Sequence, residues 1–383
     1  MRAKIFYLLS LSLATGLVYF PILGNDFLYF WDDQWVVMNY YTEGGFNIEN
    51  IWAIFTEFYH GQYSPLNESL YLILYSLFGY DPFAFHLASL LIHFINVLLV
   101  FKCVILLFEM RSKMEVKYYT GIAFLTALLF AIHPFNVESV AWMSASKVLV
   151  YALYYLIATY FFIRYLQKNK IIYLVFTAVF FIFSFLGKEQ AVTFPVWMLL
   201  IYWIAGYSFK DKKVWLTTLP FICLALLGGV VTMLSQSATG GGELSEAPSY
   251  LIWQRFVYAC YSFCEYLFKC ILPFKLSYLY PFPTIIGDPL PTWLLVYPLL
   301  VIVSVASFWK YLVSNKVLFC SLIFFFIHIA VTLHIISLSR FAVVADRYVY
   351  IASTGICFAL SYLTIYLINK FKKRGKIVYS VPC

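Results

Sequence analysis

Apolar stretches of near-bilayer length recur along the 383-residue chain. About 20 apolar residues form a helix that crosses a membrane, and a soluble fold has no interior that could bury so many of them. Hydrophobic residues make up 63% of the chain and charged residues only 11%, whereas soluble domains carry about 25% charged residues. We therefore expect an all-α polytopic membrane protein, a single domain over residues 1–383 with about ten transmembrane helices. The expected spans are Ile5–Leu23, Phe83–Phe108, Tyr119–Ile132, Val148–Ile163, Ile171–Leu186, Ala191–Gly206, Val214–Leu234, Trp293–Trp309, Val317–Leu338 and Val349–Ile368.

The positions of Lys and Arg orient these spans. Basic residues resist translocation and accumulate in cytoplasmic loops. If both chain ends lie inside, 19 of the 26 basic residues and 3 of the 18 acidic residues fall on that side. The inner face then has a net charge of +16 and the outer face −8, which together make the +8 of the whole chain. The positive charge thus reflects topology, so the bilayer is the expected partner and nucleic acid is not.

Two long outer loops are expected, at residues 24–82 and 235–291. Tyr250–Ile271 in the second loop is apolar but contains three charged residues, and a crossing there would invert every later loop. We expect it to form an interfacial or re-entrant helix. Leu70–Phe78 in the first loop is too short to cross and is expected to lie along the membrane surface.

Four polar clusters interrupt this apolar chain, and all of them fall at helix ends on the expected outer face. Membrane proteins keep ionisable groups near the bilayer where these groups pair or function. We therefore expect the clusters to converge around one outward-facing cavity. The clusters are Trp31–Trp35, His133–Glu138, Gly187–Gln190 and Asp346–Tyr348.

The acidic pair Asp32 and Asp33 lies between two Trp residues at the mouth of the first helix. Adjacent carboxylates suit a general base or a cation site, because ionisation of one disfavours ionisation of the other. The alternative is a solvated acidic turn. Whether a metal binds there is left open.

Two cations have acidic neighbours in the sequence. Lys188 precedes Glu189, and Arg347 follows Asp346. Each pair either forms its own ion pair at a helix end or presents its cation to a phosphate group. Arginine suits phosphate because its planar fork binds two oxygens at once.

Other polar residues have structural alternatives. His133 and Glu138 either belong to the site or cap the turn between two spans, where Pro134 breaks the helix. His86, His93 and Asn96 share one face of the second span, where hydrogen bonding between helices is the favoured interpretation.

Seven motifs, in this order, resemble those of the membrane half of the transmembrane and tetratricopeptide-repeat (TMTC) O-mannosyltransferases and their bacterial relatives. The likeness covers nearly the whole chain. The motifs are Trp31-Asp32-Asp33; Tyr63-Ser64-Pro65-Leu66; Gly79-Tyr80-Asp81-Pro82 before His86 and His93; His133-Pro134 with Glu138-Ser139-Val140-Ala141-Trp142; Gly187-Lys188-Glu189-Gln190-Ala191-Val192-Thr193; Leu272-Pro273-Phe274 with Leu279-Tyr280-Pro281-Phe282-Pro283; and Ala345-Asp346-Arg347-Tyr348-Val349-Tyr350.

The resemblance implies a GT-C glycosyltransferase fold and transfer of a mannose-like sugar from a polyprenyl-phosphate carrier to an acceptor hydroxyl, with inversion, on the outer or lumenal face. By this analogy Asp32 or Asp33 is the base, and Lys188 and Arg347 hold the carrier phosphate. The resemblance implies no certain cofactor besides the lipid-linked donor. The supporting residues that it implies are His86, His133, Glu138, Lys147, Glu189, Asp346 and Tyr348, with Lys147 the only cation left in a basic element that is diluted here.

Alternatives to a transferase are a transporter or lipid flippase and a non-catalytic scaffold. The chain has no internal inverted repeat, and its polar groups lie at helix ends rather than near the midplane. The 34-residue repeats typical of the family do not follow the membrane part, so the acceptor, protein or glycan, stays open. A bias towards Phe, Tyr, Ile and Lys favours a bacterial cytoplasmic membrane over the endoplasmic reticulum.

Overall fold

A computed structural model describes residues 2–111, 114–237, 250–277, 279–335 and 342–378. The described chain is almost entirely helical, with one two-stranded antiparallel sheet that pairs β1 with β2. The elements are α1 (Arg2–Tyr19), η1 (Phe20–Gly24), α2 (Asp33–Val36), α3 (Tyr40–Glu43), α4 (Ile48–Thr56), α5 (Pro65–Phe78), α6 (Pro82–Arg111), α7 (Val116–Ile132), α8 (Asn136–Ala141), η2 (Met143–Ala145), α9 (Ser146–Lys168), α10 (Ile171–Gly187), η3 (Glu189–Thr193), α11 (Phe194–Ala205), α12 (Lys212–Ser237), α13 (Ile252–Ile271), β1 (Tyr280–Pro281), η4 (Thr292–Leu295), α14 (Val296–Ser314), α15 (Lys316–Ile329), η5 (Ala330–Thr332), β2 (Ala342–Val344), η6 (Asp346–Val349) and α16 (Ser353–Val378).

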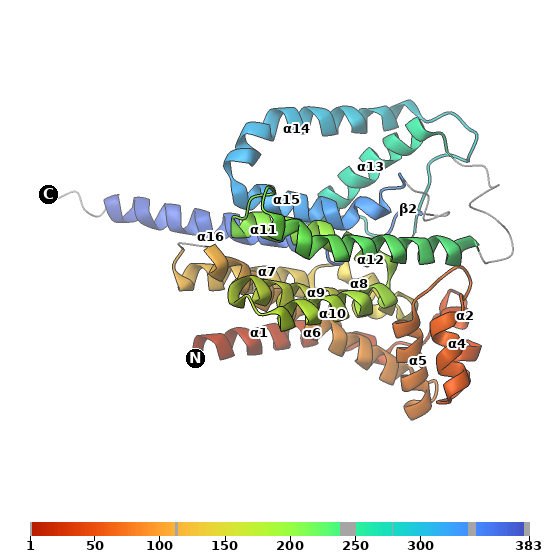
Figure 1. Ribbon diagram of the computed structural model, residues 1–383. Coiled ribbons are helices and arrows are strands. Elements are labelled where there is room, and N and C mark those ends of the chain that lie inside the picture. Colours follow the sequence, from red (N-terminus) through yellow and green to blue (C-terminus); the bar gives the residue numbers. More distant parts are fainter. Residues whose placement is uncertain (1, 112–113, 238–249, 278, 336–341, 379–383) are drawn as a thin grey trace.

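The all-α polytopic membrane class is confirmed. Within the described residues, six helices are long and apolar enough to cross a membrane, and four shorter apolar helices accompany them. These ten helices coincide with the ten expected spans. In Figure 1 they run side by side, and α1 begins at the same end of the bundle at which α16 ends, as an even number of crossings requires. We call the opposite end of the bundle the distal end.

The last two expected spans are longer than the helices that form them. α15 ends at Ile329, and residues 336–338 lie outside the described part of the chain. α16 begins at Ser353, so the expected start at Val349 is wrong. Val349 and Tyr350 are fully buried but belong to the turn η6 and its cap. Their apolar character comes from packing inside the protein and not from a membrane helix.

The two long loops contain helices of their own. In Figure 1, α4 and α5 stand at the distal end, crosswise to the membrane helices. α5 extends the short apolar stretch Leu70–Phe78 back to Pro65, which occupies the first turn of the helix, where its missing N–H costs nothing. α13 is not among the candidate spans. It packs against α14, α16 and β2, and its placement in the membrane interface stays a prediction.

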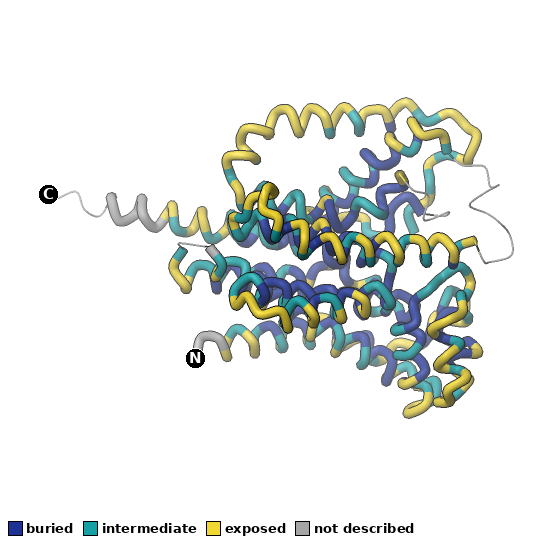
Figure 2. The backbone as a smooth tube through the Cα atoms, viewed as in Figure 1, coloured by how far each residue is buried: buried dark blue, intermediate teal, exposed yellow. Residues whose placement is uncertain are grey.

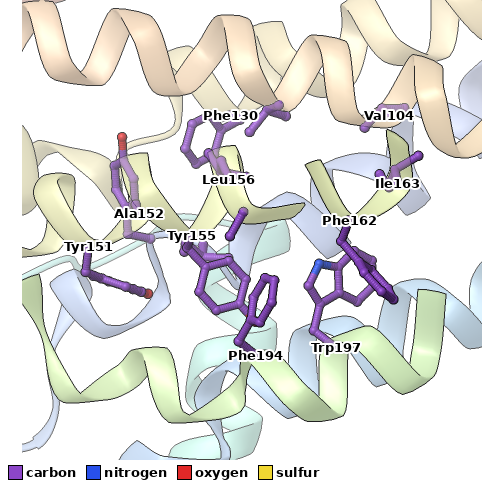
Figure 3. Close-up of a cluster of buried hydrophobic side chains, with 14 of the residues drawn as sticks. Val104, Phe130, Tyr151, Ala152, Tyr155, Leu156, Phe162, Ile163, Phe194 and Trp197 are labelled. Atoms are coloured by element: carbon purple, nitrogen blue, oxygen red, sulfur yellow. The ribbon is translucent and has the colours of Figure 1, made fainter. Parts of the chain in front are cut away.

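The interior of the bundle is formed mainly by α6, α7, α9 and α11, and the buried stretches of the chain are seen in Figure 2. Aromatic rings fill the space between α9 and α11 (Figure 3): Tyr155 contacts Phe194 edge to face, with ring centroids 5.0 Å apart. Dense packing of this kind, and not water exclusion, holds membrane helices together. α14, all of which the structure describes, contains no buried residue.

Candidate functional site

The four polar clusters lie in turns, which the bundle brings together in pairs. η6 contacts α8, and α2 contacts η2. Lys188 lies at the end of α10, immediately before η3, and its ammonium nitrogen lies 5.1 Å from the ring centroid of Tyr348 in η6. The clusters of Glu138, Lys188 and Arg347 are thus joined by tertiary packing, and Asp32, although about 300 residues before Arg347 in sequence, lies near enough to feel its charge.

Arg347 pairs with Glu138 and not with its sequence neighbour Asp346. Its Nη1 lies 2.5 Å from Glu138 Oε1, and its backbone N–H donates to Glu138 Oε2 at 2.7 Å. The guanidinium also lies over the rings of Trp142 and Tyr348, 5.3 and 5.1 Å from their centroids. Glu138 therefore holds η6 against α8.

Lys188 is a buried cation whose Nζ has no hydrogen-bond partner in the described chain. Burial lowers the pKa of Lys188 to about 7, against the charge of Glu189, which raises it; Lys147 and Arg347 lower it further. No hydrogen bond joins Lys188 to Glu189, although the charge of Glu189 acts on the ammonium. An ammonium kept away from water without an acceptor is costly, and a bound anion would relieve that cost.

Gly187 explains how Lys188 reaches this position. A Cβ at Gly187 would lie 2.9 Å from the backbone nitrogen of Tyr151. Only glycine lets the end of α10 approach α9 this closely. The chain then leaves the helix at Lys188 in an extended conformation, which directs its side chain towards Tyr348.

The adjacent carboxylates Asp32 and Asp33 have different environments. Asp33 is 1% exposed; its Oδ2 accepts from the Leu28 N–H at 2.9 Å, and its Oδ1 accepts from the Ser144 N–H at 3.0 Å and from the Ser144 hydroxyl. It fastens the first loop to η2. Asp32 is half-buried, and burial raises its pKa while the nearby charge of Arg347, the Trp35 side chain and the charge of Lys147 lower it. The charges of Arg347 and Lys147 thus act on Asp32, whereas both carboxylate oxygens of Asp33 accept hydrogen bonds from backbone groups.

Lys147 connects this site to the first loop. Its Nζ donates to Gln62 Oε1 at 2.5 Å, and its charge acts on both Asp32 and Glu68. Glu68 is 8% exposed and accepts a hydrogen bond from Asn39 at 3.1 Å. Burial raises the pKa of Glu68 to about 7. Glu68 is not among the residues expected in the site from the sequence, although an acidic residue in an otherwise apolar helix indicates a paired or functional group.

Asp346 lies beside the cation cluster but faces another loop. It is buried, and burial followed by the charge of Glu138 raises its pKa to about 7. Tyr280 belongs to β1, which pairs with β2 just before Asp346. The pairing of β1 with β2 thus brings the second long loop beside η6.

The two histidines expected in the site are placed differently. The Nε2 of His133 contacts the Cys270 carbonyl at 3.0 Å, and its Nδ1 accepts from the Phe135 N–H at 3.2 Å. Both ring nitrogens are therefore engaged in holding α13 and the turn before α8. His86 is 2% exposed, and no hydrogen bond reaches either of its ring nitrogens within the described residues. The structure records no contact between His86 and the cations.

A buried network under η6 positions the cation-bearing turn. His93 Nδ1 lies 2.6 Å from the Tyr350 hydroxyl, and Asn96 Nδ2 donates to that hydroxyl at 3.2 Å. His93 also contacts the Ala131 carbonyl. The interhelical hydrogen bonds expected for His93 and Asn96 are confirmed. They anchor Tyr350, three residues after Arg347, to α6.

We expect Tyr350→Phe to reduce the free energy of unfolding in detergent by about 1–2 kcal/mol, because the change leaves buried His93 and Asn96 without this partner. The matched control is Tyr366→Phe on α16, where the side chain is 51% exposed and the expected loss is close to zero. Thermal unfolding of both variants measures the difference. Equal stabilities would show that the network does not support the turn.

Metal binding was left open by the sequence. Within the described ranges, no group of three or more His, Cys, Asp or Glu side chains is arranged to hold a metal ion.

Comparison with known proteins finds no matching family model and no significantly similar solved structure. Curated relatives do match. The human and mouse proteins named Protein O-mannosyl-transferase TMTC1 are each 29% identical over 157 residues, which is 38% of this chain and 16% and 15% of theirs. Protein O-mannosyl-transferase F38B6.6 of Caenorhabditis elegans is 26% identical over 237 residues, 59% of this chain and 31% of its own.

The matched region thus spans less than a third of each of these relatives. The matches agree with the seven motifs in pointing to one group of proteins. Over the matched residues, the resemblance of this chain to the TMTC O-mannosyltransferases is confirmed.

Proposed function

We propose that this chain is a GT-C-type membrane glycosyltransferase that moves a sugar from a polyprenyl-phosphate carrier to an acceptor hydroxyl. The observation that carries the proposal is the buried ammonium of Lys188, which has no acceptor among the described residues and shares the ring of Tyr348 with Arg347. Two cations converging in a buried turn suit a phosphate group. The printed names of the relatives support sugar transfer.

The proposed reaction is a displacement at the anomeric carbon. Asp32 takes the proton from the acceptor hydroxyl, whose oxygen forms a bond to that carbon. The bond between the carbon and the phosphate oxygen breaks, and polyprenyl phosphate leaves with the electron pair. Lys188 and Arg347 offset the charge that grows on the leaving phosphate. A base and a phosphate clamp on opposite sides of the carbon produce inversion.

The positions of the other polar residues support this division of roles. Glu138 fixes Arg347, and Gly187 lets Lys188 approach the same turn. Glu189 and Lys147 lie near enough to act on the charge of Lys188, and we assign them contacts with the sugar hydroxyls. We place the site on the outer face because the basic residues gather in the loops at the other end, and in a bacterial cytoplasmic membrane because of the bias towards Phe, Tyr, Ile and Lys.

The test uses the purified chain in liposomes with a radiolabelled polyprenyl-phosphate mannose. We expect label to move to a hydroxyl-bearing acceptor as polyprenyl phosphate is released, and we expect a polyprenyl-phosphate sugar to co-purify and to be identified by mass spectrometry. A transporter or flippase would move label across the bilayer without an acceptor. That result, with no transfer to any acceptor, would refute the proposal.

A further inference from the structure

Gln190, in η3, carries a buried oxygen for which the described chain supplies no partner. Its side chain is 3% exposed, and its Nε2 donates to the backbone carbonyl of Tyr348 at 3.5 Å. Because the nitrogen is engaged there, the oxygen on the other side of the amide points away from this carbonyl. No donor reaches Oε1 in the part of the chain that the structure describes. A buried amide oxygen without a donor is costly, so we expect a ligand group to occupy this place.

Gln254 shows the usual arrangement of a buried glutamine. It is 4% exposed. Its Oε1 accepts from the Leu251 N–H at 3.0 Å, and its Nε2 donates to the Asp288 carbonyl at 3.1 Å. Both ends of this amide are used to hold α13 to the second long loop. Gln190 differs because only the nitrogen end of its amide is used.

The backbone of Gln190 is held by a buried chain of hydrogen bonds. The Gln190 carbonyl accepts from the Thr193 hydroxyl at 3.0 Å. Thr193 Oγ1 lies 3.3 Å from the hydroxyl of Tyr155, which Figure 3 labels. That hydroxyl lies 2.9 Å from His328 Nε2. These contacts tie η3 to α9 and α15, so the free oxygen is held in place before any ligand binds.

A second unpartnered group lies beside the same tyrosine. Lys188 Nζ is 5.1 Å from the ring centroid of Tyr348 and has no acceptor within the described ranges. An ammonium and an amide oxygen are natural partners, yet Lys188 Nζ and Gln190 Oε1 make no hydrogen bond with each other. A ligand that satisfies both atoms must carry an anionic acceptor and a hydroxyl donor close together.

A glycosyl phosphate carries these two groups on neighbouring atoms. Its phosphate is attached to the anomeric carbon, C1, and the hydroxyl on C2 is the sugar hydroxyl nearest to that phosphate. If Lys188 and Arg347 hold the phosphate, the C2 hydroxyl is the donor group best placed for Gln190. Positive charge grows at C1 as the bond to the phosphate breaks. A hydrogen bond from the C2 hydroxyl therefore strengthens in the transition state.

We propose that Gln190 Oε1 accepts a hydrogen bond from the C2 hydroxyl of the donor sugar. Gln190 is then the residue by which the enzyme distinguishes sugars that differ at C2. The inference rests on the proposed transferase function and deepens it, because it names the part of the donor that the site recognises.

The experiment compares polyprenyl-phosphate mannose with its 2-deoxy analogue as donors for the wild type and Gln190→Met. Methionine has nearly the length of glutamine but offers only a weak acceptor. The measured quantity is kcat/KM for the mannose donor divided by kcat/KM for the 2-deoxy donor. We expect this ratio to be about 10–100-fold lower in Gln190→Met than in the wild type. The intrinsic reactivity of the 2-deoxy donor is the same for both enzymes, and the lost contact with Tyr348 affects both donors, so neither changes the comparison.

Two further variants complete the experiment. Gln254→Met makes the same change in a buried glutamine whose amide is fully engaged, and its ratio should equal that of the wild type. Gln190→Asn keeps the amide but withdraws its oxygen by one methylene, so it should also lower the ratio and serves if Gln190→Met does not fold. The preference between mannose and glucose donors, which differ only at C2, should fall in parallel in the Gln190 variants.

The outcomes separate the inference from the proposed function. If the wild type transfers sugar and both Gln190 variants keep its ratio, Oε1 binds only water and the inference fails. An equal fall of the ratio in Gln254→Met would also overturn it, because the effect would then come from lost stability. If the wild type transfers no sugar from any polyprenyl-phosphate donor, the proposed function itself fails, and the inference fails with it.

Discussion

Asp32→Asn is expected to reduce sugar transfer by about 10³-fold, because a positioned base contributes about 10²–10⁴ to such a rate. Asn has the shape of Asp but cannot take the acceptor proton. Asp32 is half-buried, and its carboxylate lies within the influence of Arg347 and Lys147. The KM values for donor and acceptor should change little. Initial rates in liposomes with labelled donor measure the effect.

The adjacent residue provides the matched control. Asp33→Asn loses an acceptor for the Leu28 and Ser144 N–H groups, so we expect it to destabilise the first loop by about 1–3 kcal/mol. The transfer activity of Asp33→Asn should follow the fraction of folded protein and recover at lower temperature. The activity of Asp32→Asn should stay low at every temperature. Full activity of Asp32→Asn would end the assignment of the base.

The second large effect is expected at Lys188. Lys188→Gln removes a cation from the proposed phosphate site, and we expect kcat/KM for the donor to fall about 10²–10³-fold, the usual loss when one group that stabilises transition-state charge is removed. Lys210→Gln, an exposed residue near the other end of the bundle, is the control. An unchanged kcat/KM in Lys188→Gln would remove this lysine from the mechanism.

The pH dependence of the wild type adds a separate test of Lys188. Burial lowers the pKa of Lys188 to about 7, so the ammonium is charged below that pH and neutral above it. We expect kcat/KM for the donor to fall as the pH rises through about 7. In Lys188→Arg the guanidinium stays charged at every pH of the assay, so kcat/KM of this variant should not fall as the pH rises through about 7. At low pH, activity falls because Asp32 becomes protonated, and burial raises the pKa of Asp32. We expect this acidic limb in both the wild type and Lys188→Arg.

The membrane helices could be predicted from the sequence because the length and apolarity of a span are local properties. Ile5–Leu23 and Ile171–Leu186 coincide with a candidate span and an apolar helix of the structure. The prediction was wrong at Val349 because a buried turn needs apolar residues as much as a membrane helix does. Hydropathy alone does not separate the two environments.

The polar clusters could also be predicted, since charged residues are rare in such a chain and stand out. Their partners could not. Arg347 pairs with Glu138, 209 residues away, although Asp346 is adjacent to it. Glu68 is buried and accepts a hydrogen bond from Asn39, 29 residues away, which no local pattern in the sequence indicates.

The sequence alone determined the class of protein, the positions of its ten apolar helices and the residue types available for chemistry. The tertiary structure decided which residue does what, and the pair Asp32 and Asp33 illustrates why. Their side chains are identical, but the N–H groups of Leu28 and of the distant Ser144 engage Asp33, whereas the charges of Arg347 and Lys147 act on Asp32. The role of a carboxylate depends on burial and partners, which are properties of the folded chain.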